Sequence, residues 1–340
     1  TEVIGTLSGP RTTPEAPELQ EMLAGALARG RRAVAMEVSS HALALQRVRA
    51  TRFAVAVFTN LSQDHLDFHR DMEDYFAAKA ALFEPDYADA AVVNLDDRRG
   101  RWLLEQATIP TEGYSIADVE DLDVGVVRSR FRWRGQSVEL PYGGRFIVSN
   151  ALAAATAAAH LGIAPDAIAE GLASALPVPG RFEAIDEGQP FAVLVDYSHK
   201  PGALASALAS ARDAVGSGRL LLVFGAGGDR DAAKRPKMGE VAARMADRVL
   251  LTSDNPRGED PLAIIDAVRS GMARTAGLTV EPDRGAAIAL AIEEAGPGDV
   301  VVIAGKGHET VQLFRDRAVP FDDRAVARDV LRALRTERGW

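Results

Sequence analysis

The segment Arg248-Val249-Leu250-Leu251-Thr252-Ser253-Asp254-Asn255-Pro256-Arg257 joins a run of apolar residues to a short polar loop. The apolar run, residues 248–252, is typical of a strand buried in a parallel sheet, and the residues from Asp254 onward cannot continue it. In an open α/β sheet, ligands bind at the loops that follow the carboxyl ends of the strands. The guanidinium of Arg257 can bind a carboxylate through two parallel hydrogen bonds, whereas Asp254 and Asn255 can hold an ammonium group. The loop is therefore suited to a small zwitterion such as an amino acid, although an Asx-Pro turn with a solvated arginine would have the same sequence.

Strand-like and helix-like segments alternate around this loop, which predicts an α/β fold with a mostly parallel sheet and helices on both faces. Pro177-Val178-Pro179-Gly180 interrupts the alternation and predicts a joint between two domains, residues 1–178 and residues 179–340. The second domain is expected to be Rossmann-like. Its predicted strands are 192–196, 220–224, 248–252 and 300–304, and its predicted helices lie near 201–215, 237–246, 261–275, 285–295 and 322–336.

The first half of the chain shows the same alternation. It starts at a strand-and-turn pattern, residues 3–6, with no capping segment before it, so we expect a fragment whose beginning is missing. Residues 119–147, which include Phe131 and Trp133, alternate between apolar and polar side chains and predict antiparallel strands. The remaining predicted strands are 33–38, 54–59 and 90–94, and the predicted helices are 15–28, 72–82, 99–106, 148–159 and 165–175.

Composition narrows the class of protein. The chain has 340 residues, enough for two domains, and 47% of them are hydrophobic, enough for a sizeable core. Its net charge of −9 argues against a general nucleic-acid binder or a protein of anionic membrane surfaces. The absence of cysteine excludes disulfides and thiolate chemistry. The longest apolar stretch, residues 151–164, is too short to span a membrane. We therefore expect a cytoplasmic protein without membrane insertion.

Two polar clusters follow predicted strands of the first half. In residues 37–41, Glu-Val-Ser-Ser-His, a carboxylate at a strand end followed by hydroxyl groups could hold Mg²⁺ and phosphate, or a serine could cap a helix. Residues 59–69 contain two histidines and two aspartates within one loop. A zinc site is possible there, but a site for a hard cation that uses Asp, His and water is equally compatible with the sequence.

Three further features carry charge. Lys79 lies among alanines and aromatic residues at helical spacing, which by itself favours a lysine that extends along an amphipathic helix. The glycine-rich segment 225–231 follows a predicted strand, and its backbone N–H groups with Arg230 could hold an anion. A second glycine loop, residues 305–309, follows the last predicted strand. Because these two loops carry opposite charges and both follow strands, we expect them to face one cleft and form a single ligand site.

These segments together resemble the Mur ligase family, and within it the MurE type. The resemblance spans nearly the whole chain, and the matching segments occur in the family's order. They are TTPE at 12–15, AMEVSSHAL at 35–43, FTNLSQDHLDFH at 58–69, AAKAALF at 77–83, PGRFE at 179–183, VDYSHKPGAL at 195–204, GAGGDRDAAKRPKMG at 225–239, DNPR at 254–257 and GKGHE at 305–309.

The resemblance implies a central ATPase-type domain, here incomplete, followed by a Rossmann-like C-terminal domain. It also implies a ligase of peptidoglycan precursor synthesis that is a cytoplasmic monomer, uses ATP and Mg²⁺, and acts on small molecules. In this family, ATP phosphorylates the free carboxyl of D-glutamate in UDP-MurNAc-L-Ala-D-Glu, and an amino acid attacks the acyl phosphate to form an amide. Because two anions must approach each other, Mg²⁺ and cationic side chains have to offset their repulsion.

The resemblance also assigns roles to individual residues. Glu37 and His65 match metal ligands, and Lys79 matches a lysine that the family carbamylates, so that it becomes a further, anionic metal ligand. His199 matches a histidine near the phosphates, which makes Lys79, His65 and His199 the candidate catalytic residues. The UDP-muramoyl dipeptide is expected at Thr12, Thr13, Ser39 and Arg47, the nucleotide at Asn150, Arg181 and Asp196, and the amino acid at Arg230, Asp254, Asn255, Arg257, Gly305 and Glu309.

The form of residues 254–257 resembles the enzymes that add meso-diaminopimelate, because lysine-adding relatives replace the arginine. Diaminopimelate has a second carboxylate at its far end, and Arg257 is expected to select it. The alternatives are a lysine-adding relative, a folyl-polyglutamate synthetase, or a fragment that binds an amino acid without turning it over. The last remains open because the family's phosphate-binding loop, G-x-x-x-x-G-K-[ST], occurs nowhere in the chain, nor does the family's uridine-binding domain. The chain by itself is therefore expected to hydrolyse ATP poorly.

Overall fold

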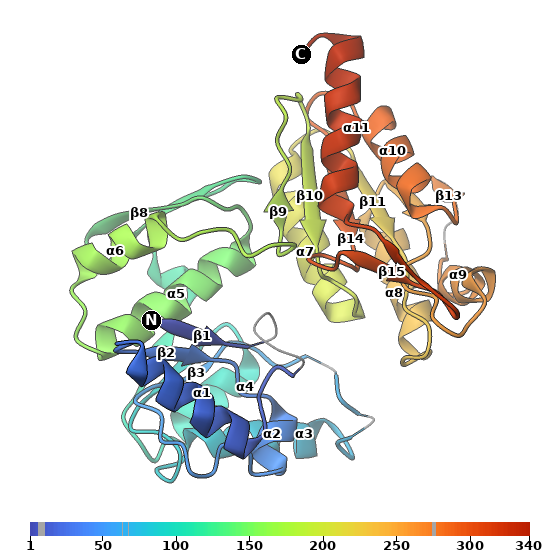
Figure 1. The fold of residues 1–340 in the computed structure, drawn as a ribbon. Coiled ribbons are helices and arrows are strands. Elements are labelled where there is room, and N and C mark those ends of the chain that lie inside the picture. Colours follow the sequence, from blue (N-terminus) through green and yellow to red (C-terminus); the bar gives the residue numbers. More distant parts are fainter. Residues whose placement is uncertain (6–10, 63, 67, 274–276) are drawn as a thin grey trace. The chain divides into compact units, whose positions relative to one another are not determined.

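The computed structural model describes residues 1–5, 11–62, 64–66, 68–273 and 277–340 (Figure 1). The chain forms two compact units. Unit 1 consists of residues 1–118 and 149–168, and unit 2 consists of residues 119–148 and 169–340. Residues 119–148, which we expected in the first domain, therefore group with unit 2. The proposed domain boundary at residue 178 stays a prediction.

Unit 2 is built on one six-stranded sheet, coloured from yellow-green to orange in Figure 1. Five strands are parallel and only the edge strand β9 is antiparallel, as expected for a Rossmann-like domain. The strand order is β13 (Leu278–Val280), β12 (Arg248–Leu251), β11 (Leu220–Phe224), β14 (Val300–Ala304), β10 (Ala192–Asp196) and β9 (Glu183–Ala184).

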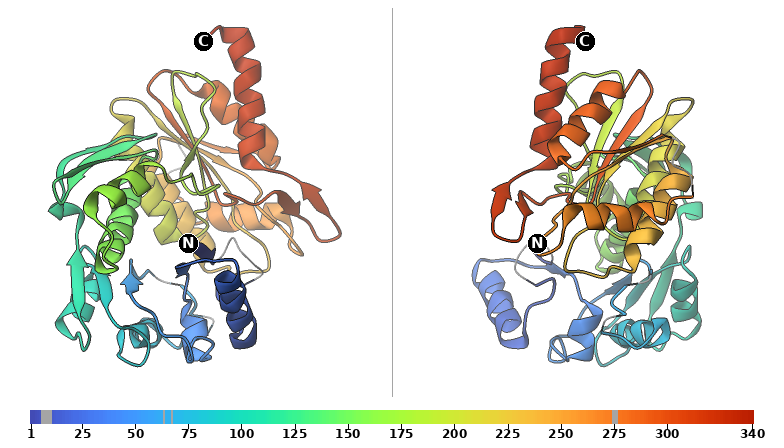
Figure 2. Two further views of the ribbon diagram at one scale, coloured as in Figure 1. Left: turned by 60° about the vertical axis from the view of Figure 1, so that its left-hand side comes forward. Right: turned by 90° about the vertical axis from the view of Figure 1, so that its right-hand side faces the viewer.

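The central strands of this sheet are covered on both faces, which is why their sequences are continuous apolar runs. Every residue of β11 and β14 is buried. One apolar cluster joins the sheet to three helices, and a second cluster joins it to two others (Figure 2). The first set is α7 (Pro201–Val215), α8 (Lys234–Met245) and α9 (Pro261–Arg269), and the second is α10 (Arg284–Glu294) and α11 (Asp323–Arg338).

Two smaller antiparallel sheets complete unit 2. The residues predicted as antiparallel form β6 (Glu120–Val124), β7 (Ser129–Trp133) and β8 (Gln136–Leu140), with Phe131 and Trp133 buried. A hairpin of β15 (Val311–Leu313) and β16 (Ala318–Pro320) follows the glycine loop after β14. We did not predict this hairpin.

Unit 1 contains two short parallel sheets instead of one. The first pairs β1 (Glu2–Ile4) with β2 (Val34–Met36), and the second has the order β3 (Ala56–Phe58), β4 (Ala91–Asn94) and β5 (Thr111–Tyr114). One apolar core joins them to the surrounding helices. These are α1 (Ala16–Ala28), α2 (Ser40–Ala44), α3 (Met72–Ala80) and α4 (Arg98–Glu105). Two further helices, α5 (Arg145–His160) and α6 (Pro165–Ala173), each begin in one unit and end in the other.

No helix in the described residues is both long and apolar enough to cross a membrane. In particular, α5, which contains most of the longest apolar stretch, is 16 residues long.

Candidate active site

The loops that follow β12 and β14 meet at the carboxyl edge of the unit 2 sheet, as the opening segment of the sequence predicts. A side-chain carbon added to Gly305 would lie 2.5 Å from Oδ2 of Asp254, so the two loops are in direct contact. Gly305 has a φ of +118°, in the region that favours glycine. Because a larger residue would collide with Asp254, the glycine is required by the approach as well as by the backbone.

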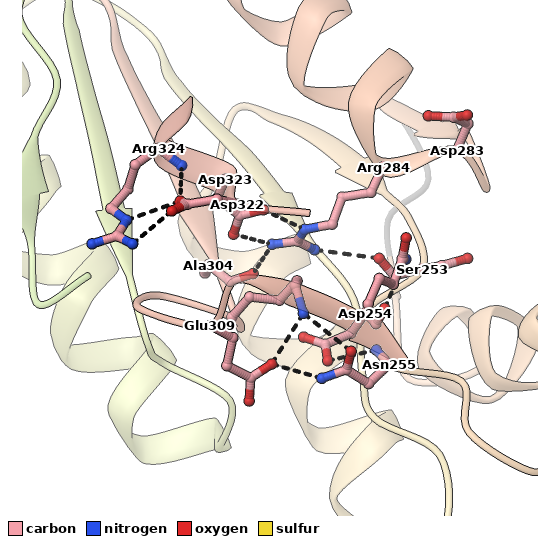
Figure 3. Close-up of polar contacts among 12 residues, drawn as sticks. Ser253, Asp254, Asn255, Asp283, Arg284, Ala304, Glu309, Asp322, Asp323 and Arg324 are labelled. Carbon is pink, nitrogen blue, oxygen red and sulfur yellow. Dashed lines mark hydrogen bonds and ion pairs between the residues drawn. The ribbon is translucent and has the colours of Figure 1, made fainter. Parts of the chain in front are cut away.

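Asn255, Lys306 and Glu309 form a polar cluster where these loops touch, and Figure 3 labels Asn255 and Glu309. Asn255 and Lys306 are buried, and Glu309 is partly exposed. The amide of Asn255 donates to Oε2 of Glu309 at 2.7 Å, and Nζ of Lys306 donates to the same oxygen at 3.0 Å. Lys306 also donates to Oδ1 of Asn255 at 3.1 Å and to the carbonyl of Val311 at 2.6 Å. Oδ1 of Asn255 also accepts from the Leu313 N–H at 2.9 Å, so the amide holds the Glu309 carboxylate in place. A carboxylate fixed in this way suits an ammonium group of a ligand.

Asp254 directly precedes Asn255 of this cluster and is also buried. Burial raises the pKa of its carboxyl above the usual value, and the positive charges of Arg284 and Lys306 act in the opposite direction. Its backbone carbonyl accepts a hydrogen bond of 2.8 Å from Gln312. Neighbouring cations and backbone contacts therefore hold this loop at the strand end.

Arg257 and Arg230 lie together at the glycine loop after β11. Nη1 of Arg257 donates to the carbonyl of Gly228 at 2.8 Å. A carbon added to Gly227 would lie 3.0 Å from that Nη1 and 4.0 Å from Cγ of Arg230. The loops after β11 and β12 also contact each other directly, because a carbon added to Gly228 would lie 1.9 Å from the carbonyl oxygen of Pro256. The Arg257 guanidinium at these loops and the Glu309 carboxylate give the site one group of each charge, as a zwitterion needs, whereas Arg230 is exposed and its guanidinium contacts the Asp229 carbonyl.

Glu259 joins the same two loops. Its carboxylate accepts hydrogen bonds of 2.7 and 2.8 Å from Arg235 and one of 2.6 Å from the backbone N–H of Asp229. The hydrogen bond from Arg235, followed by that from Asp229, lowers the pKa of Glu259 from 4.5 to about 2.

This shift predicts an acid-sensitive contribution of Glu259 to stability. A carboxyl whose pKa is lower in the folded protein stabilises it fully above the unfolded pKa, and the contribution is lost as the pH falls from about 4.5 through about 2. Glu259→Gln should therefore lower the free energy of unfolding near pH 7 and reduce its fall on acidification, measured by urea denaturation at several pH values. Glu240→Gln on α8, whose side chain is 64% exposed, is the control. An unchanged pH profile for Glu259→Gln would contradict the assignment.

Arg181 and Asp196, expected at the nucleotide, and His199, expected near the phosphates, lie at the end of β10. The guanidinium of Arg181 lies 4.7 Å from the centre of the Tyr197 ring, and the His199 and His308 rings lie 4.6 and 4.9 Å from it. The buried carboxylate of Asp196 accepts hydrogen bonds from the backbone of Phe182 and Ser198, both 2.8–2.9 Å, and from the Ser198 hydroxyl. Asp196 thus shapes the turn, whereas the rings and Arg181 offer a surface for stacking.

Asn150, also expected at the nucleotide, is exposed on α5 and belongs to unit 1.

In unit 1, two of the three candidate metal residues, His65 and Lys79, lie beside Tyr75 of α3, whereas Glu37 follows β2. The rings of His65 and Tyr75 are 5.7 Å apart, and Nζ of Lys79 lies 5.4 Å from the Tyr75 ring centre. Asp64 lies 3.0 Å from Nε2 of His65. No group of three or more histidine, cysteine or acidic side chains suited to a metal occurs among the described residues, and Asp67 lies outside them.

The residues expected to hold the muramoyl substrate are joined by hydrogen bonds. The Thr13 hydroxyl lies 2.9 Å from the Glu37 carbonyl and 3.4 Å from the Ser39 hydroxyl, and it accepts from the Ser39 N–H at 2.9 Å. Arg47 reaches the Thr13 carbonyl at 3.4 Å. Thr12 immediately precedes this group. Ser39 also caps α2 by accepting from the N–H of Ala42, so the interpretation of this segment as a helix start is confirmed.

Sequence reasoning assigned no role to several residues of the unit 2 site. Lys306 lies within the glycine loop 305–309, between Gly305 and Gly307. The sequence does not show that its side chain is buried, and so gave no reason to assign it a role. Tyr197 and Gln312 had no distinguishing signal, because each acts through a neighbour that only the fold supplies.

Comparison with known proteins gives consistent matches over both units. The model of the Mur ligase middle domain matches residues 1–158, and that of the Mur ligase glutamate ligase domain matches residues 180–307. The chain is 48% identical to the UDP-N-acetylmuramoyl-L-alanyl-D-glutamate–2,6-diaminopimelate ligase of Solibacter usitatus over 339 residues, 96% of this chain and 68% of the relative. It is 48% identical to the enzyme of the same name from Streptomyces coelicolor, over 95% of this chain and 67% of that protein.

Solved structures agree with these matches. A structure of a UDP-N-acetylmuramoyl-L-alanyl-D-glutamate–2,6-diaminopimelate ligase is 35% identical, with a TM-score of 0.66, and the match covers 98% of this chain and 72% of that one. A folylpolyglutamate synthase from Thermotoga maritima is 18% identical, with a TM-score of 0.60 over 88% of this chain and 68% of that chain, and shares the fold alone.

Proposed function

The chain belongs to the Mur ligase family, and from that premise we propose that it adds meso-diaminopimelate to the D-glutamate of UDP-MurNAc-L-Ala-D-Glu at the expense of ATP. The reaction is an amide ligation of peptidoglycan precursor synthesis. The observation that supports the choice of amino acid is that Arg257 and the hydrogen-bonded pair Asn255–Glu309 lie at the same edge of the unit 2 sheet. A diamino dicarboxylic acid needs a cationic group for its far carboxylate and an anionic or amide group for its ammonium.

The reaction has two steps: an electrophile is formed first, and a nucleophile then attacks it. Transfer of the γ-phosphoryl group of ATP to the glutamate carboxylate gives an acyl phosphate and ADP. The amine of diaminopimelate then attacks the acyl carbon, and loss of phosphate and a proton leaves the amide. Asn255, Arg257 and Glu309 would orient the amino acid for attack, which converts a bimolecular step into one between bound partners. Arg181 and His199 would contact the nucleotide.

Glu37, His65 and a carbamate on Lys79 would hold Mg²⁺ in unit 1. Carboxylate, carbamate and imidazole atoms suit this hard cation. The Glu37 carboxylate packs against Gly5, because a carbon added to that glycine would lie 2.6 Å from Oε1. Bound Mg²⁺ would neutralise charge on the phosphoryl group that is transferred. Thr12, Thr13, Ser39 and Arg47 would hold the muramoyl dipeptide. We also propose that the protein acts as a monomer in the cytoplasm.

The proposal is tested by titrating the protein with meso-diaminopimelate and with L-lysine in a calorimeter. The two ligands share one amino-acid end and differ in the far carboxylate, so their comparison isolates the contribution of Arg257. We expect diaminopimelate to bind at least tenfold more tightly than lysine. The reaction itself is then checked by incubating the wild-type protein with UDP-MurNAc-L-Ala-D-Glu, diaminopimelate and ATP. Mass spectrometry detects the tripeptide product. Preference for lysine, or ligation of glutamate instead, would overturn the proposal.

A further inference from the structure

We propose that Arg284 and Asp323 are positioning residues for the incoming amino acid: together they fix the two strand ends from which the amino-acid-binding loops start. This inference rests on the proposed function of the loops at residues 254–257 and 305–309. Neither residue would touch the substrate.

Arg284 and Asp323 form a two-pronged ion pair in the interior of unit 2 (Figure 3). Nε of Arg284 donates to Oδ1 of Asp323 and Nη2 donates to Oδ2, both at 2.7 Å. The side chain of each residue is fully buried. Because a guanidinium is planar with five N–H donors, this pairing leaves donors that point away from the carboxylate.

Those remaining donors reach the two strand ends. Nη2 of Arg284 also donates to the carbonyl of Ala304 at 3.0 Å, and Nη1 reaches the carbonyl of Ser253 at 3.4 Å. Ala304 is the last residue of β14 and directly precedes Gly305, and Ser253 directly precedes Asp254. One side chain therefore contacts the backbone immediately before each loop.

The topology explains why such a link is needed. β12 and β14 are not neighbours in the sheet, because β11 lies between them. The ladder hydrogen bonds of the sheet therefore do not join the two strand ends to each other. Arg284 spans that interval and so adds a link between the starts of the two loops to the direct hydrogen bonds among Asn255, Lys306 and Glu309.

Helix capping does not account for these two residues. Asp283 accepts a hydrogen bond from Ala286 N–H at the start of α10, and Asp322 accepts one from Arg324 N–H at the start of α11. The aspartates that precede Arg284 and Asp323 thus already serve the helix ends.

A buried ion pair is also weak evidence for a role in stability. Burying two charges is costly, and apolar side chains of similar size often replace a buried pair without loss. Arg284 also opposes the effect of burial on the pKa of Asp254, which links the pair electrostatically to the amino-acid loop.

The decisive variant replaces the pair as a whole. Arg284→Met combined with Asp323→Leu removes both charges, so neither is left unpaired in the interior. We expect a folded protein with a melting temperature close to that of the wild type. Its affinity for meso-diaminopimelate, measured by calorimetry, should fall at least tenfold. Affinity for an ATP analogue should change less than twofold. In turnover assays, KM of the double variant for diaminopimelate should exceed that of the wild type by the same factor.

Arg284→Lys is the second variant. It keeps a positive charge opposite Asp323 but lacks the planar fork that reaches both carbonyls. We expect it to lose affinity for diaminopimelate as well. Full retention of affinity by this variant would mean that only charge matters, and would contradict the positioning role.

Arg248 and Glu294 supply a matched control. They form a two-pronged pair with both distances at 2.7 Å, but Arg248 is the first residue of β12, at the end of the strand remote from the loop. Arg248→Met with Glu294→Leu should leave diaminopimelate affinity unchanged. Equal losses in both double variants, or wild-type affinity in the Arg284–Asp323 variant, would overturn the inference. If the wild type itself failed to bind diaminopimelate, the proposed function would fail instead.

Discussion

Replacing Arg257 with alanine should weaken binding of meso-diaminopimelate by at least about thirtyfold. Truncation of one partner of a hydrogen-bonded charge pair in a closed site costs roughly 2–5 kcal/mol, and 2 kcal/mol corresponds to a factor of about thirty. Arg257 enters the site from a backbone with a φ of +51°, and its N–H donates to the Leu313 carbonyl at 2.9 Å. The backbone of the loop therefore fixes where this side chain starts.

The contrast between ligands tests the assigned role of Arg257. Because lysine lacks the second carboxylate, Arg257→Ala should change its affinity little, and the preference for diaminopimelate should disappear. Nucleotide affinity should also be retained. Calorimetric titration with the three ligands measures these effects.

Arg315→Ala is the control, since Arg315 holds the same loop from outside through the Gly258 carbonyl at 3.1 Å. A comparable loss in both variants would mean that Arg257 only supports the loop, and equal loss of nucleotide and amino acid would contradict its assignment.

Replacing Lys79 with alanine should reduce the rate of ligation by at least about a hundredfold. If Lys79 acts as a carbamate, it contributes a negative charge that holds a metal ion, and charge stabilisation of this kind is worth several kcal/mol. A factor of one hundred corresponds to roughly 3 kcal/mol. Its position in the last turn of α3, beside the Tyr75 ring that His65 also contacts, places it at the candidate metal residues.

Chemical rescue distinguishes the carbamate from a lysine that is merely cationic. Short carboxylates or bicarbonate should restore part of the activity of Lys79→Ala, because they can occupy the space of the missing anion. Lys79→Arg should remain inactive, since it keeps the positive charge but cannot be carbamylated in the same way. An active arginine variant, rescue by amines, or full activity of Lys79→Ala would favour a lysine on an amphipathic helix surface. Lys237→Ala, at an exposed position of α8, is the control for nonspecific effects of bicarbonate.

The sequence predicted the unit 2 sheet closely because its central strands are buried on both faces. Residues 192–196, 220–224 and 300–304 are continuous apolar runs with polar loops after them, and the strands have these bounds. Edge strands were less predictable: β13 is three residues long and only partly buried, so its sequence is hardly distinguishable from a loop. In unit 1, β5 contains a glycine and a glutamate and was missed for the same reason.

The site was predictable where residues act through their own chemistry. Asp254, Asn255, Arg257 and Glu309 could be identified because charged groups followed a strand or a glycine loop. Arg284 and Asp323 could not, because an acidic residue before each of them makes the segment look like an ordinary helix start. Their function depends on two backbone carbonyls that are 51 residues apart in the chain, at 253 just after β12 and at 304 at the end of β14, and only the sheet brings them close together.

The direct contact between the loops after β11 and β12 has a consequence for the thermodynamics of ligand binding. The N–H of Gly228 donates to the Asn255 carbonyl at 2.9 Å, Arg257 donates back to the Gly228 carbonyl, and the backbone at Gly228 has no room for a side chain. Neither loop can open without the other. Much of the conformational entropy that ordering such loops would cost is therefore lost when the domain folds, before any amino acid arrives. The receptor surface is preorganised, so a larger part of each contact with the ligand contributes to affinity.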